Sequence, residues 1–423
     1  MTKKNIAIIG SGISGLSAAY FLKPFANVTL YEKEARLGGH TRTLTVDYNG
    51  THIPVDTGFI VFNYENYFHL SRLFETLDVR VKKGSMSFAA SVDDGRVEWG
   101  AKTLDSLFAQ RSNLFNPAFL MGFADVVRFN KLAMETVARL PNLSLGELLT
   151  ELNMGQWFRN YYLLPMGAAI WSCPAKKMLQ FPAASFVRFF HNHGLLTIDN
   201  QPQWYTVDGG SQEYVKKIQP IIGDANIKLS SRVRSVVRRD GKVVVQSESG
   251  DDVYDDVVLA CHADEALGLL VDSDELERDV LSPFKYSVNH AFLHRDTAQM
   301  PLRKRCWSSW NYLARSKGQD DSAVAVTYWM NSLQGIDERY PLFVTLNPIK
   351  PVDPALIFDK HVFTHPIFTG DAVMAQTHIP RIQGKRQTWF CGAYQGNGFH
   401  EDGIKSSVNM VKAMGYSIPW NGQ

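Results

Sequence analysis

Residues 5–15 read NIAIIGSGISG, an apolar run that leads directly into three glycines with the spacing GxGxxG. The apolar run predicts a buried strand, and the residues after the loop predict a helix that ends near Leu22. A second predicted strand, Val28–Tyr31, ends in the acidic residue Glu32. Glycines alone often mark ordinary turns. A strand, a glycine loop, a helix, a strand and an acid in this order form a dinucleotide-binding unit.

Each glycine of this loop has its own physical role. Gly10 allows the tight turn out of the strand, and Gly12 lets a pyrophosphate approach the backbone because it has no side chain. Gly15 allows the helix to pack closely on the sheet. The helix begins at the loop, with Ser14 in its first turn, so its free N–H groups face the phosphates. We therefore expect Gly10, Gly12, Ser14 and Gly15 to hold the diphosphate.

The residues at and after the second strand indicate which dinucleotide is bound. Glu32 can accept hydrogen bonds from both ribose hydroxyls, and its charge disfavours the 2′-phosphate of NADP. Lys33, the next residue, is a further expected cofactor contact. Arg36-Leu37-Gly38-Gly39 then adds a cation that can neutralise pyrophosphate charge and a second glycine turn that allows close approach. An ordinary dehydrogenase has no need of this addition, so the sequence predicts FAD.

The composition limits the class of protein. The 423 residues are 45% hydrophobic, which is enough for two packed domains, and the formal net charge is only +2. This charge, without a long basic run, gives no reason to expect nucleic-acid binding. The cysteines lack the spacing of a metal site, so we expect no metal. We expect buried, reduced thiols at Cys173, Cys261, Cys306 and Cys391.

The location of the protein is predicted from its first residues and its hydropathy. The first strand begins almost at once, without a signal peptide, and no run of about 20 apolar residues is present to span a membrane. We expect a cytoplasmic protein. Residues 114–140 mix Phe and Met with basic residues, and they could form an amphipathic helix on the inner membrane face. Packing in the core is the commoner role of such a helix.

The hydrophobic pattern predicts an α/β fold with two discontinuous domains. The Rossmann-like FAD-binding domain is expected to comprise residues 1–80, 205–270 and 381–423. The α+β substrate-binding domain is expected to comprise residues 81–204 and 271–380.

Local patterns within these domains predict a few elements. Residues 86–98 are expected to form a hairpin, and residues 102–200 are expected to be mostly helical. From Asn226 to Ala260 the pattern predicts a meander of strands. Val288–Leu293 and Ala323–Trp329 are further expected strands.

The residues from Glu32 to Gly39 follow the pattern E-x-x-x-R-x-G-G and resemble the flavin amine oxidoreductase superfamily. This superfamily includes monoamine and polyamine oxidases, protoporphyrinogen oxidase and phytoene-type desaturases. The resemblance implies an FAD-binding domain of the GR2 type, in which Val233 and Val236 of the meander lie beside the adenine. Most members carry Arg directly after the glycine pair, where this chain has His40.

Two further segments carry the resemblance. Residues 207–212, VDGGSQ, match a P-x-G-G segment that precedes the meander in relatives. Near the C-terminus a strand runs into Gly392, and after a loop Asp402-Gly403-Ile404 begins a helix; relatives have Glu in place of Asp402. The resemblance implies that this helix points its N-terminus at the flavin ring and stabilises the reduced form. Taken alone, the tail could be a glycine-rich surface loop that caps a helix.

The residues over the flavin ring decide the chemistry, which in this superfamily is hydride transfer from a C–H bond to flavin N5. Amine oxidases have a Lys that holds a water near N5, and alignment places Asn289 there. They also have a cage Tyr where this chain has His400. A histidine suits proton abstraction near neutral pH, and Glu401 could orient it. His400 could instead only pack on the flavin loop, and Tyr394 is a weaker catalytic candidate.

An apolar segment in the middle of the chain bears on the substrate. Residues 163–174 read LLPMGAAIWSCP, and several phenylalanines follow before Trp204. Such a run is typical of a core, but it could also line a tunnel for an oily substrate. The run resembles a branch of predicted NAD/FAD-binding proteins that is similar to the methyl-branched fatty acyl desaturases of bacterial furan fatty acid formation.

The sequence therefore predicts an FAD-dependent oxidoreductase, and the resemblance implies that it desaturates a methyl-branched fatty acyl chain to a diene, with dioxygen as the acceptor that reoxidises the flavin. Three alternatives stay open: an amine oxidase that releases hydrogen peroxide, a carotenoid or porphyrinogen desaturase, and a flavin-bound lipid carrier without redox chemistry. The expected partners are an apolar lipid substrate and a membrane surface, and the sequence does not decide the oligomeric state.

Overall fold

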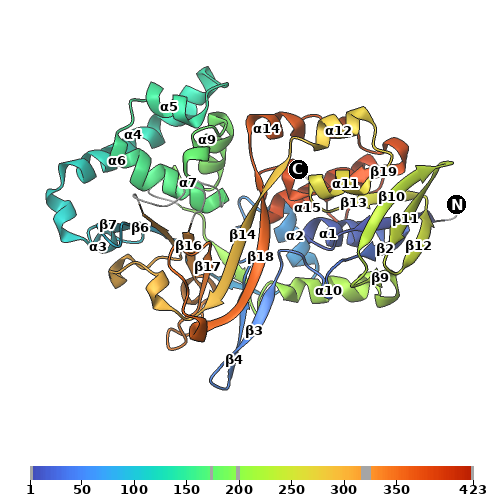
Figure 1. Cartoon of the computed structure of the whole chain (residues 1–423), viewed down its shortest axis with the longest axis horizontal. Helices are drawn as coiled ribbons and strands as arrows, with labels where there is room; N and C mark the ends of the chain where they lie inside the picture. Colours follow the sequence, from blue (N-terminus) through green and yellow to red (C-terminus); the bar gives the residue numbers. More distant parts are fainter. Residues whose placement is uncertain (1–2, 172–174, 197–200, 316–324, 421–423) are drawn as a thin grey trace.

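Two lobes lie side by side in a computed structural model that describes residues 3–171, 175–196, 201–315 and 325–420 (Figure 1). The first lobe, at the right of Figure 1, contains a parallel sheet with strand order β19-β13-β1-β2-β9. Because β1 pairs with both β2 and β13, the first strand of the sequence lies in the middle of this sheet. The strands are β1 (Asn5–Ile9), β2 (Asn27–Tyr31), β9 (Ile227–Lys228), β13 (Asp256–Leu259) and β19 (Thr388–Phe390).

Each face of the parallel sheet has its own core. Ile6 and Ile8 belong to the core formed with one set of helices, and Ala7 belongs to the core formed with the antiparallel meander. Both faces of β1 are therefore apolar, which is why the strand reads as a continuous apolar run. The first core contains residues of α1 (Ile13–Leu22), α2 (Phe68–Thr76), α10 (Gln212–Ile222) and α15 (His400–Ala413). The second contains residues of β10 (Val233–Arg239), β11 (Lys242–Ser247), β12 (Gly250–Tyr254), α11 (Ala263–Leu269) and α12 (Glu275–Leu281).

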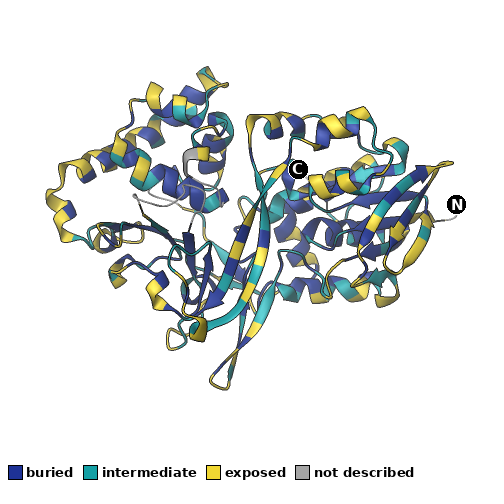
Figure 2. Cartoon of the chain, in the orientation of Figure 1, coloured by how far each residue is buried: buried dark blue, intermediate teal, exposed yellow. Residues whose placement is uncertain are grey.

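The second lobe, at the left of Figure 1, is built on a sheet with strand order β18-β14-β17-β16-β15-β6-β7. Its strands are β6 (Phe88–Val92), β7 (Val97–Gly100), β14 (Lys285–His294), β15 (Trp310–Ala314), β16 (Ala325–Trp329), β17 (Phe343–Leu346) and β18 (Ile357–Ile367). The helices of this lobe are α3 (Leu104–Leu107), α4 (Pro117–Arg139), α5 (Leu145–Glu151), α6 (Gln156–Phe158), α7 (Leu164–Trp171), α8 (Ala175–Met178) and α9 (Ala183–Asn192). Figure 2 shows that the inner strands and the inner helix faces are buried.

The boundary between the lobes is formed by the long antiparallel pair of β14 and β18, which runs down the middle of Figure 1. Three short elements continue it: the hairpin of β3 (Thr43–Tyr48) and β4 (Thr51–Asp56), the pair of β5 (Val81–Lys83) and β8 (Tyr205–Val207), and α13 (Met330–Gln334). Helix α14 (Gly370–Gln376) follows β18 and packs against α12. The side chains of β14 and β18 are therefore placed to meet the loops of the first lobe.

The α/β prediction is confirmed, and so are most of the predicted elements. Strands β6 and β7 form the hairpin expected over residues 86–98, and the segment from 102 to 200 is mainly helical where it is described. The two ends of the predicted meander were wrong: Ile227–Lys228 pairs with β2 at the edge of the parallel sheet, and Asp256–Leu259 pairs with β1 and β19 inside it, so the meander comprises only β10, β11 and β12. The two-domain boundaries stay a prediction.

Three expectations about the surface and the thiols need correction or restriction. The inner face of α4 is buried in the core of the second lobe, so the helix does not present one continuous apolar side to solvent. Cys306 and Cys391 are buried, but Cys261 is only partly buried because it follows β13 in a turn. Cys173 lies outside the described residues.

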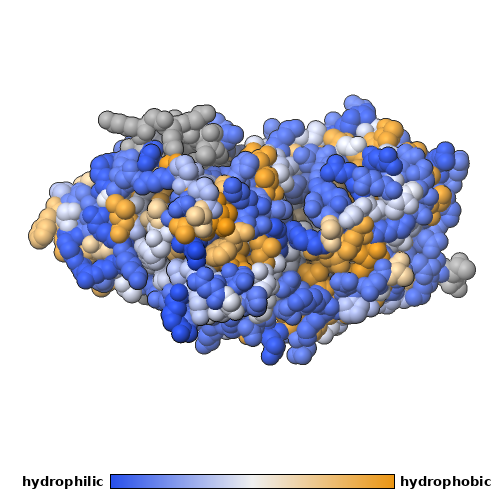
Figure 3. All heavy atoms as spheres, turned by 60° about the horizontal axis from the view of Figure 1, so that its bottom comes forward, coloured by the Kyte–Doolittle hydropathy of each residue, from blue (hydrophilic) through white to orange (hydrophobic). Residues whose placement is uncertain are grey.

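In the described part of the chain, no helix is long and apolar enough to cross a membrane. On the face shown in Figure 3, apolar atoms gather in patches on both lobes.

Candidate functional site

Two glycine turns meet at the N-terminus of α1. Gly10 and Gly38 have φ values of +102° and +114°, which side chains rarely adopt. A Cβ on Gly15 would lie 1.8 Å from the carbonyl oxygen of Gly10, and a Cβ on Gly39 would lie 3.0 Å from the Cα of Gly12. By contrast, a Cβ on Gly12 would meet no atom within 4 Å. The turns therefore enclose open space in front of the helix N-terminus, where a diphosphate fits.

Glu32 lies at the end of β2 and is buried. Its Oε2 accepts hydrogen bonds from the backbone N–H of Ser11 at 3.0 Å and from the Ser11 hydroxyl at 2.5 Å. Its Oε1 accepts from the backbone N–H of Glu34 at 2.9 Å. The carboxylate therefore stands directly beside the first glycine turn, as a ribose-binding acid must.

The other predicted contacts near the adenine end have local partners. Lys33 forms an ion pair with Glu265 at 2.8 Å and is about half exposed. Val236 is fully buried in the core of the meander, and the register of β10 shifts between Val233 and Ser235. Val233 therefore lies at an irregular end of the strand, where its backbone groups leave the regular ladder.

Arg36 holds the second glycine turn together. Its guanidinium donates to the carbonyl oxygens of Gly39 at 2.9 Å and of Thr41 at 3.1 Å. Burial lowers the pKa of Arg36 below its usual value. In this structure the side chain thus fixes the shape of the turn, in addition to bringing its charge near the predicted diphosphate.

The C-terminal motif packs directly on the N-terminal one. A Cβ on Gly403 would lie 2.7 Å from Cγ2 of Ile13, so only glycine lets α15 approach α1 this closely. The Ser407 hydroxyl donates to the carbonyl of Ser14 at 2.7 Å, and Ile404 is fully buried between the elements. The N-termini of α1 and α15 are therefore side by side, although α1 begins at Ile13 and α15 only at His400.

Asp402 and Gly392 shape the loop before α15. One oxygen of Asp402 accepts from the backbone N–H of Phe399 at 2.9 Å, and burial raises the pKa of this carboxyl to about 6. The N–H of Gly392 donates to the Ser406 hydroxyl at 2.8 Å. Both residues therefore fix the loop that holds His400 at the first position of α15.

His400 has two close neighbours. Its ring stacks on Phe59 with 3.8 Å between centroids and an angle of 16° between planes. Its Nε2 lies 3.0 Å from the Thr41 hydroxyl. Burial lowers the pKa of His400 to about 3, so the ring is neutral at pH 7. Its role as a base stays a prediction: the neutral form is the one a base needs, but such a low pKa makes it a weak one.

Glu401 does not orient His400, and that expectation was wrong. Its two carboxylate oxygens accept from the backbone N–H groups of His69 and Leu70, each at 3.0 Å. These N–H groups belong to the first turn of α2, where a carboxylate is a favourable cap. Adjacent residues at a helix start point about 100° apart, so the carboxylate faces α2 while the imidazole faces the boundary between the lobes.

Asn289 is buried at the lobe boundary and belongs to a chain of amides that fixes a histidine tautomer. The backbone N–H of His290 donates to Oδ1 of Asn347 at 2.8 Å, and this bond fixes the orientation of the Asn347 amide. The Nδ2 of Asn347 is therefore the atom that donates to Oδ1 of Asn289, also at 2.8 Å. The Nδ2 of Asn289 is then also a donor, and it contacts the Ser287 carbonyl and Nδ1 of His365, each at 3.2 Å. Nδ1 of His365 is therefore an acceptor, and neutral His365 carries its proton on Nε2.

Histidines from both lobes gather at this boundary. The ring of His40, which follows the second glycine turn, lies 5.4 Å from that of His365 and 6.4 Å from that of His262, measured between centroids. Its Nε2 is buried and has no hydrogen-bond partner among the described residues. Burial holds the pKa values of His40 and His262 below their usual range and lowers that of His365 to about 4. The cluster is therefore neutral at pH 7, and His40 has a polar atom left for a ligand.

The structure brings together some predicted residues and moves one away. Asn289 contacts His365, which lies beside His40, and His400 contacts Thr41, the residue after His40. The ring of Tyr394 is instead buried in the meander core against Phe284, with 4.9 Å between centroids. Sequence reasoning missed His365, although the alternation His361-x-Phe363-x-His365 is a strand pattern that places these rings on one face of β18.

The comparisons with known proteins agree with this geometry. The family model described as flavin containing amine oxidoreductase matches residues 13–305, so the chain belongs to that family. The chain is 26% identical over 273 residues to the probable flavin-containing monoamine oxidase A of Dictyostelium discoideum, over 59% of this chain and 55% of that protein. The chain spans about half the length of the first curated relatives it matches.

Solved structures share the fold over nearly the whole chain. The CLA-producing fatty acid isomerase from P. acnes aligns with a TM-score of 0.68 and 15% identity, covering 97% of this chain and 98% of that one. Cyclohexylamine oxidase from Brevibacterium oxydans aligns with a TM-score of 0.65 and 15% identity, covering 98% and 100%. The open cradle at Gly12, the buried Glu32 and the paired helix N-termini fit FAD, the flavin cofactor that membership of this family implies.

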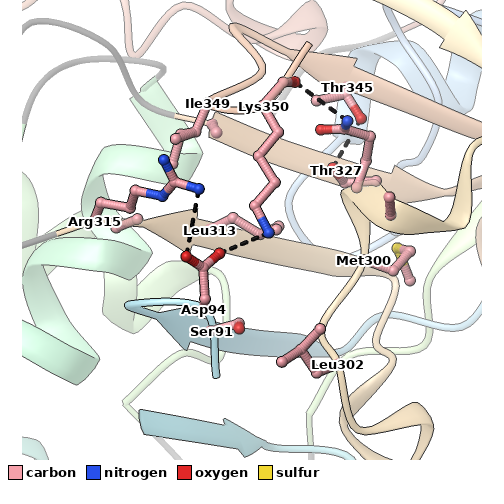
Figure 4. A pocket seen from close by; sticks show the side chains of 14 residues that line it. Ser91, Asp94, Met300, Leu302, Leu313, Arg315, Thr327, Thr345, Ile349 and Lys350 are labelled. Atoms are coloured by element: carbon pink, nitrogen blue, oxygen red, sulfur yellow. Dashed lines mark hydrogen bonds and ion pairs between the residues drawn. The ribbon is translucent and has the colours of Figure 1, made fainter. Parts of the chain in front are cut away.

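A separate hollow lies on the second lobe and is not part of this site (Figure 4). Asp94 projects into it and pairs with Lys350 at 2.6 Å and with Arg315 at 3.3 Å. The carboxylate of Asp94 is therefore already paired with two cations of the protein.

Proposed function

We propose that this oxidoreductase desaturates an apolar chain, most specifically a fatty acyl chain that bears a methylated double bond, to a conjugated diene. The observation that carries the proposal is the continuous set of uncharged rings around His400. Phe59 stacks on His400, and the neighbouring Phe399 stacks on Phe189 of α9 with 5.0 Å between centroids. Phe189 in turn lies in the aromatic core that includes Trp171. An oily substrate needs walls of this kind.

The charges near the boundary favour a neutral substrate. Glu401 and Asp402 are engaged by backbone N–H groups, and Asp359 forms a two-bond ion pair with Arg42 at 2.8 and 3.2 Å. The imidazoles are neutral for the reasons given above. A substrate ammonium group would have to break one of these pairs, whereas an alkyl chain would leave them intact.

Each residue has a defined place in the proposed reaction. Bound FAD supplies the two-electron acceptor that takes a hydride from an allylic C–H bond. A proton leaves the adjacent carbon, and His400 is the proposed acceptor because its ring is unprotonated at pH 7. His365 offers an Nε2–H donor that Asn289 keeps in one tautomer. Dioxygen then takes up two electrons and two protons as hydrogen peroxide, so the net change is alkene plus dioxygen to diene plus peroxide.

Amine oxidation is the second candidate, and family membership together with the match to a probable monoamine oxidase favours it. Asn289 in place of the expected Lys and His400 in place of the cage Tyr count against it.

Anaerobic flavin bleaching separates the two candidates. Purified holoprotein is mixed with phospholipids that carry methylated acyl chains, or with benzylamine and putrescine, and the flavin absorbance is followed. We expect bleaching with the lipid, together with the ultraviolet absorbance of a conjugated diene. Bleaching with an amine and not with the lipid would establish the second candidate. After air is admitted to the reduced protein, peroxide release without diene would contradict the proposed product.

A further inference from the structure

The outer end of the second lobe exposes apolar side chains that have no part in the proposed reaction. They belong to α3, to the 3₁₀ helix Arg111–Phe115 and to the first half of α4. Phe115 is 86% exposed, and Leu104 and Met121 are 75% and 70% exposed. We call this set the apolar tip: Leu104, Leu114, Phe115, Leu120, Met121, Phe123 and Val127. The segment between α3 and α4 forms the left edge of the molecule in Figures 1 and 2.

The charges around the tip are arranged asymmetrically. From Ser112 to Val127 no exposed residue carries a formal charge. The exposed charged residues on either side, between positions 101 and 139, are five basic and two acidic ones: Lys102, Arg111, Arg128, Lys131, Arg139, Asp105 and Glu135. Three of these cations have acidic partners, Arg111 with Asp105, Arg128 with the buried Asp125 and Arg139 with Glu151, so the surplus of positive charge that borders the uncharged apolar end is small.

The packing of α4 determines how the tip can be used. Phe119, Val126 and Phe129 are buried in the core of the lobe, so the inner face of the helix is already occupied. The exposed face is apolar over its first two turns and charged from Arg128 onward. The helix therefore cannot lie flat with an apolar side on a membrane, but its N-terminal end can enter one. Contiguous apolar groups of this kind on a soluble surface mark interaction sites.

We propose that the apolar tip inserts into the headgroup region of an anionic lipid bilayer and holds the protein at the membrane surface. The aromatic and aliphatic side chains gain from leaving water, and the bordering cations are attracted to lipid phosphates. A second copy of the chain is a poorer occupant, because its tip would bring the same surplus of positive charge to the contact. The inference is separate from the proposed substrate, since an enzyme acting on another substrate could carry the same anchor.

Vesicle flotation with the FAD-loaded protein tests the anchor. Wild type and the variant Phe115→Asp/Met121→Asp are mixed with phosphatidylcholine vesicles with or without phosphatidylglycerol. We expect wild type to float with the anionic vesicles, and the variant to bind at least about tenfold more weakly. Val271→Asp/Met374→Asp is the matched control, because Val271 and Met374 are 68% and 61% exposed but lie on the other lobe. The flavin spectrum and far-ultraviolet circular dichroism show that each variant is folded.

The role of the cations is tested in the same assay. Lys131→Glu and added salt are both expected to weaken binding to anionic vesicles, because both reduce attraction to the lipid phosphates. The inference fails if wild type binds neither kind of vesicle, or if the tip variant and the control variant bind equally. It also fails if wild type stays off vesicles and instead forms a dimer that Phe115→Asp/Met121→Asp dissociates.

Discussion

Replacing Gly12 by Ala tests whether the open space at Gly12 binds the cofactor, because the change should weaken FAD binding without destabilising the apoprotein. A methyl group on Gly12 would meet no protein atom within 4 Å, and the backbone of Gly12, with φ −64° and ψ −179°, is one that alanine adopts freely. The apoprotein should therefore tolerate the change. The same methyl would stand in the cradle between the two glycine turns, where the diphosphate must approach the N-terminus of α1.

The expected magnitudes differ between apoprotein and complex. Alanine is a somewhat poorer N-cap than glycine, but it lowers the entropy of the unfolded chain, so the free energy of unfolding should change by no more than about 1 kcal/mol. An extra methyl in a filled site costs about 1–3 kcal/mol, which corresponds to an FAD affinity that is weaker by about 5-fold to 150-fold. Gly15→Ala should instead reduce the stability of the apoprotein more than Gly12→Ala does. Its Cβ would lie 1.8 Å from the Gly10 carbonyl oxygen, so the apoprotein itself should lose about 3 kcal/mol or more.

Two measurements on each variant are sufficient. Urea unfolding of the apoprotein gives the stability, and titration with FAD, followed by the quenching of flavin fluorescence, gives the dissociation constant. Gly12→Ala with normal stability and a wild-type affinity would refute the assignment of the cradle to the diphosphate. Equal losses of apoprotein stability in the two glycine variants would refute the packing argument.

Four further changes test other parts of the site. Glu32→Ala should release FAD during purification because the ribose loses its acceptor; the ratio of flavin to protein absorbance measures this, and full occupancy would contradict it. Asn289→Asp replaces a donor to Nδ1 of His365 with an acceptor, so it should raise the pKa of His365 from about 4 and move its proton to Nδ1. Nitrogen-15 spectra of labelled histidine report the tautomer, and Asn289→Leu is the uncharged comparison; an unchanged tautomer in the Asp variant would exclude the amide chain. Burial raises the pKa of Glu401 from 4.5 to about 7, so the folded state binds more protons than the unfolded state between these values, and stability falls as pH rises through that window by at most about 3 kcal/mol. Glu401→Gln should remove this part of the pH dependence, which urea unfolding at pH 5 and pH 8 measures. The same stability difference between the two pH values in wild type and variant would contradict this assignment. His400→Ala should keep the yellow colour but slow flavin reduction in stopped flow, and an unaltered rate would leave His400 with a packing role.

The cofactor could be predicted from the sequence because its expected site is made by the backbone. A diphosphate needs free N–H groups and the absence of side chains, and both requirements are written locally as glycines at fixed spacings. Gly10, Gly12 and Gly15 could thus be assigned roles before any contact was known. The meander and the hairpin were also predictable, since a strand shows its alternation along its own length. Ile227–Lys228 was misplaced because two residues carry too little pattern to show which strand they pair with.

Only the tertiary structure decided what surrounds the boundary between the lobes. Glu401 is next to His400 in the sequence but caps α2, because neighbouring side chains at a helix start point in different directions. Asn289 was found by alignment, yet its partner Asn347 follows β17 and its partner His365 lies on β18, and only these contacts fix the proton of His365 on Nε2. Sequence thus determined the cofactor, whose binding depends on local backbone shape. Structure decided the protons and charges at the boundary between the lobes, because these depend on side chains that meet only when distant parts of the chain come together.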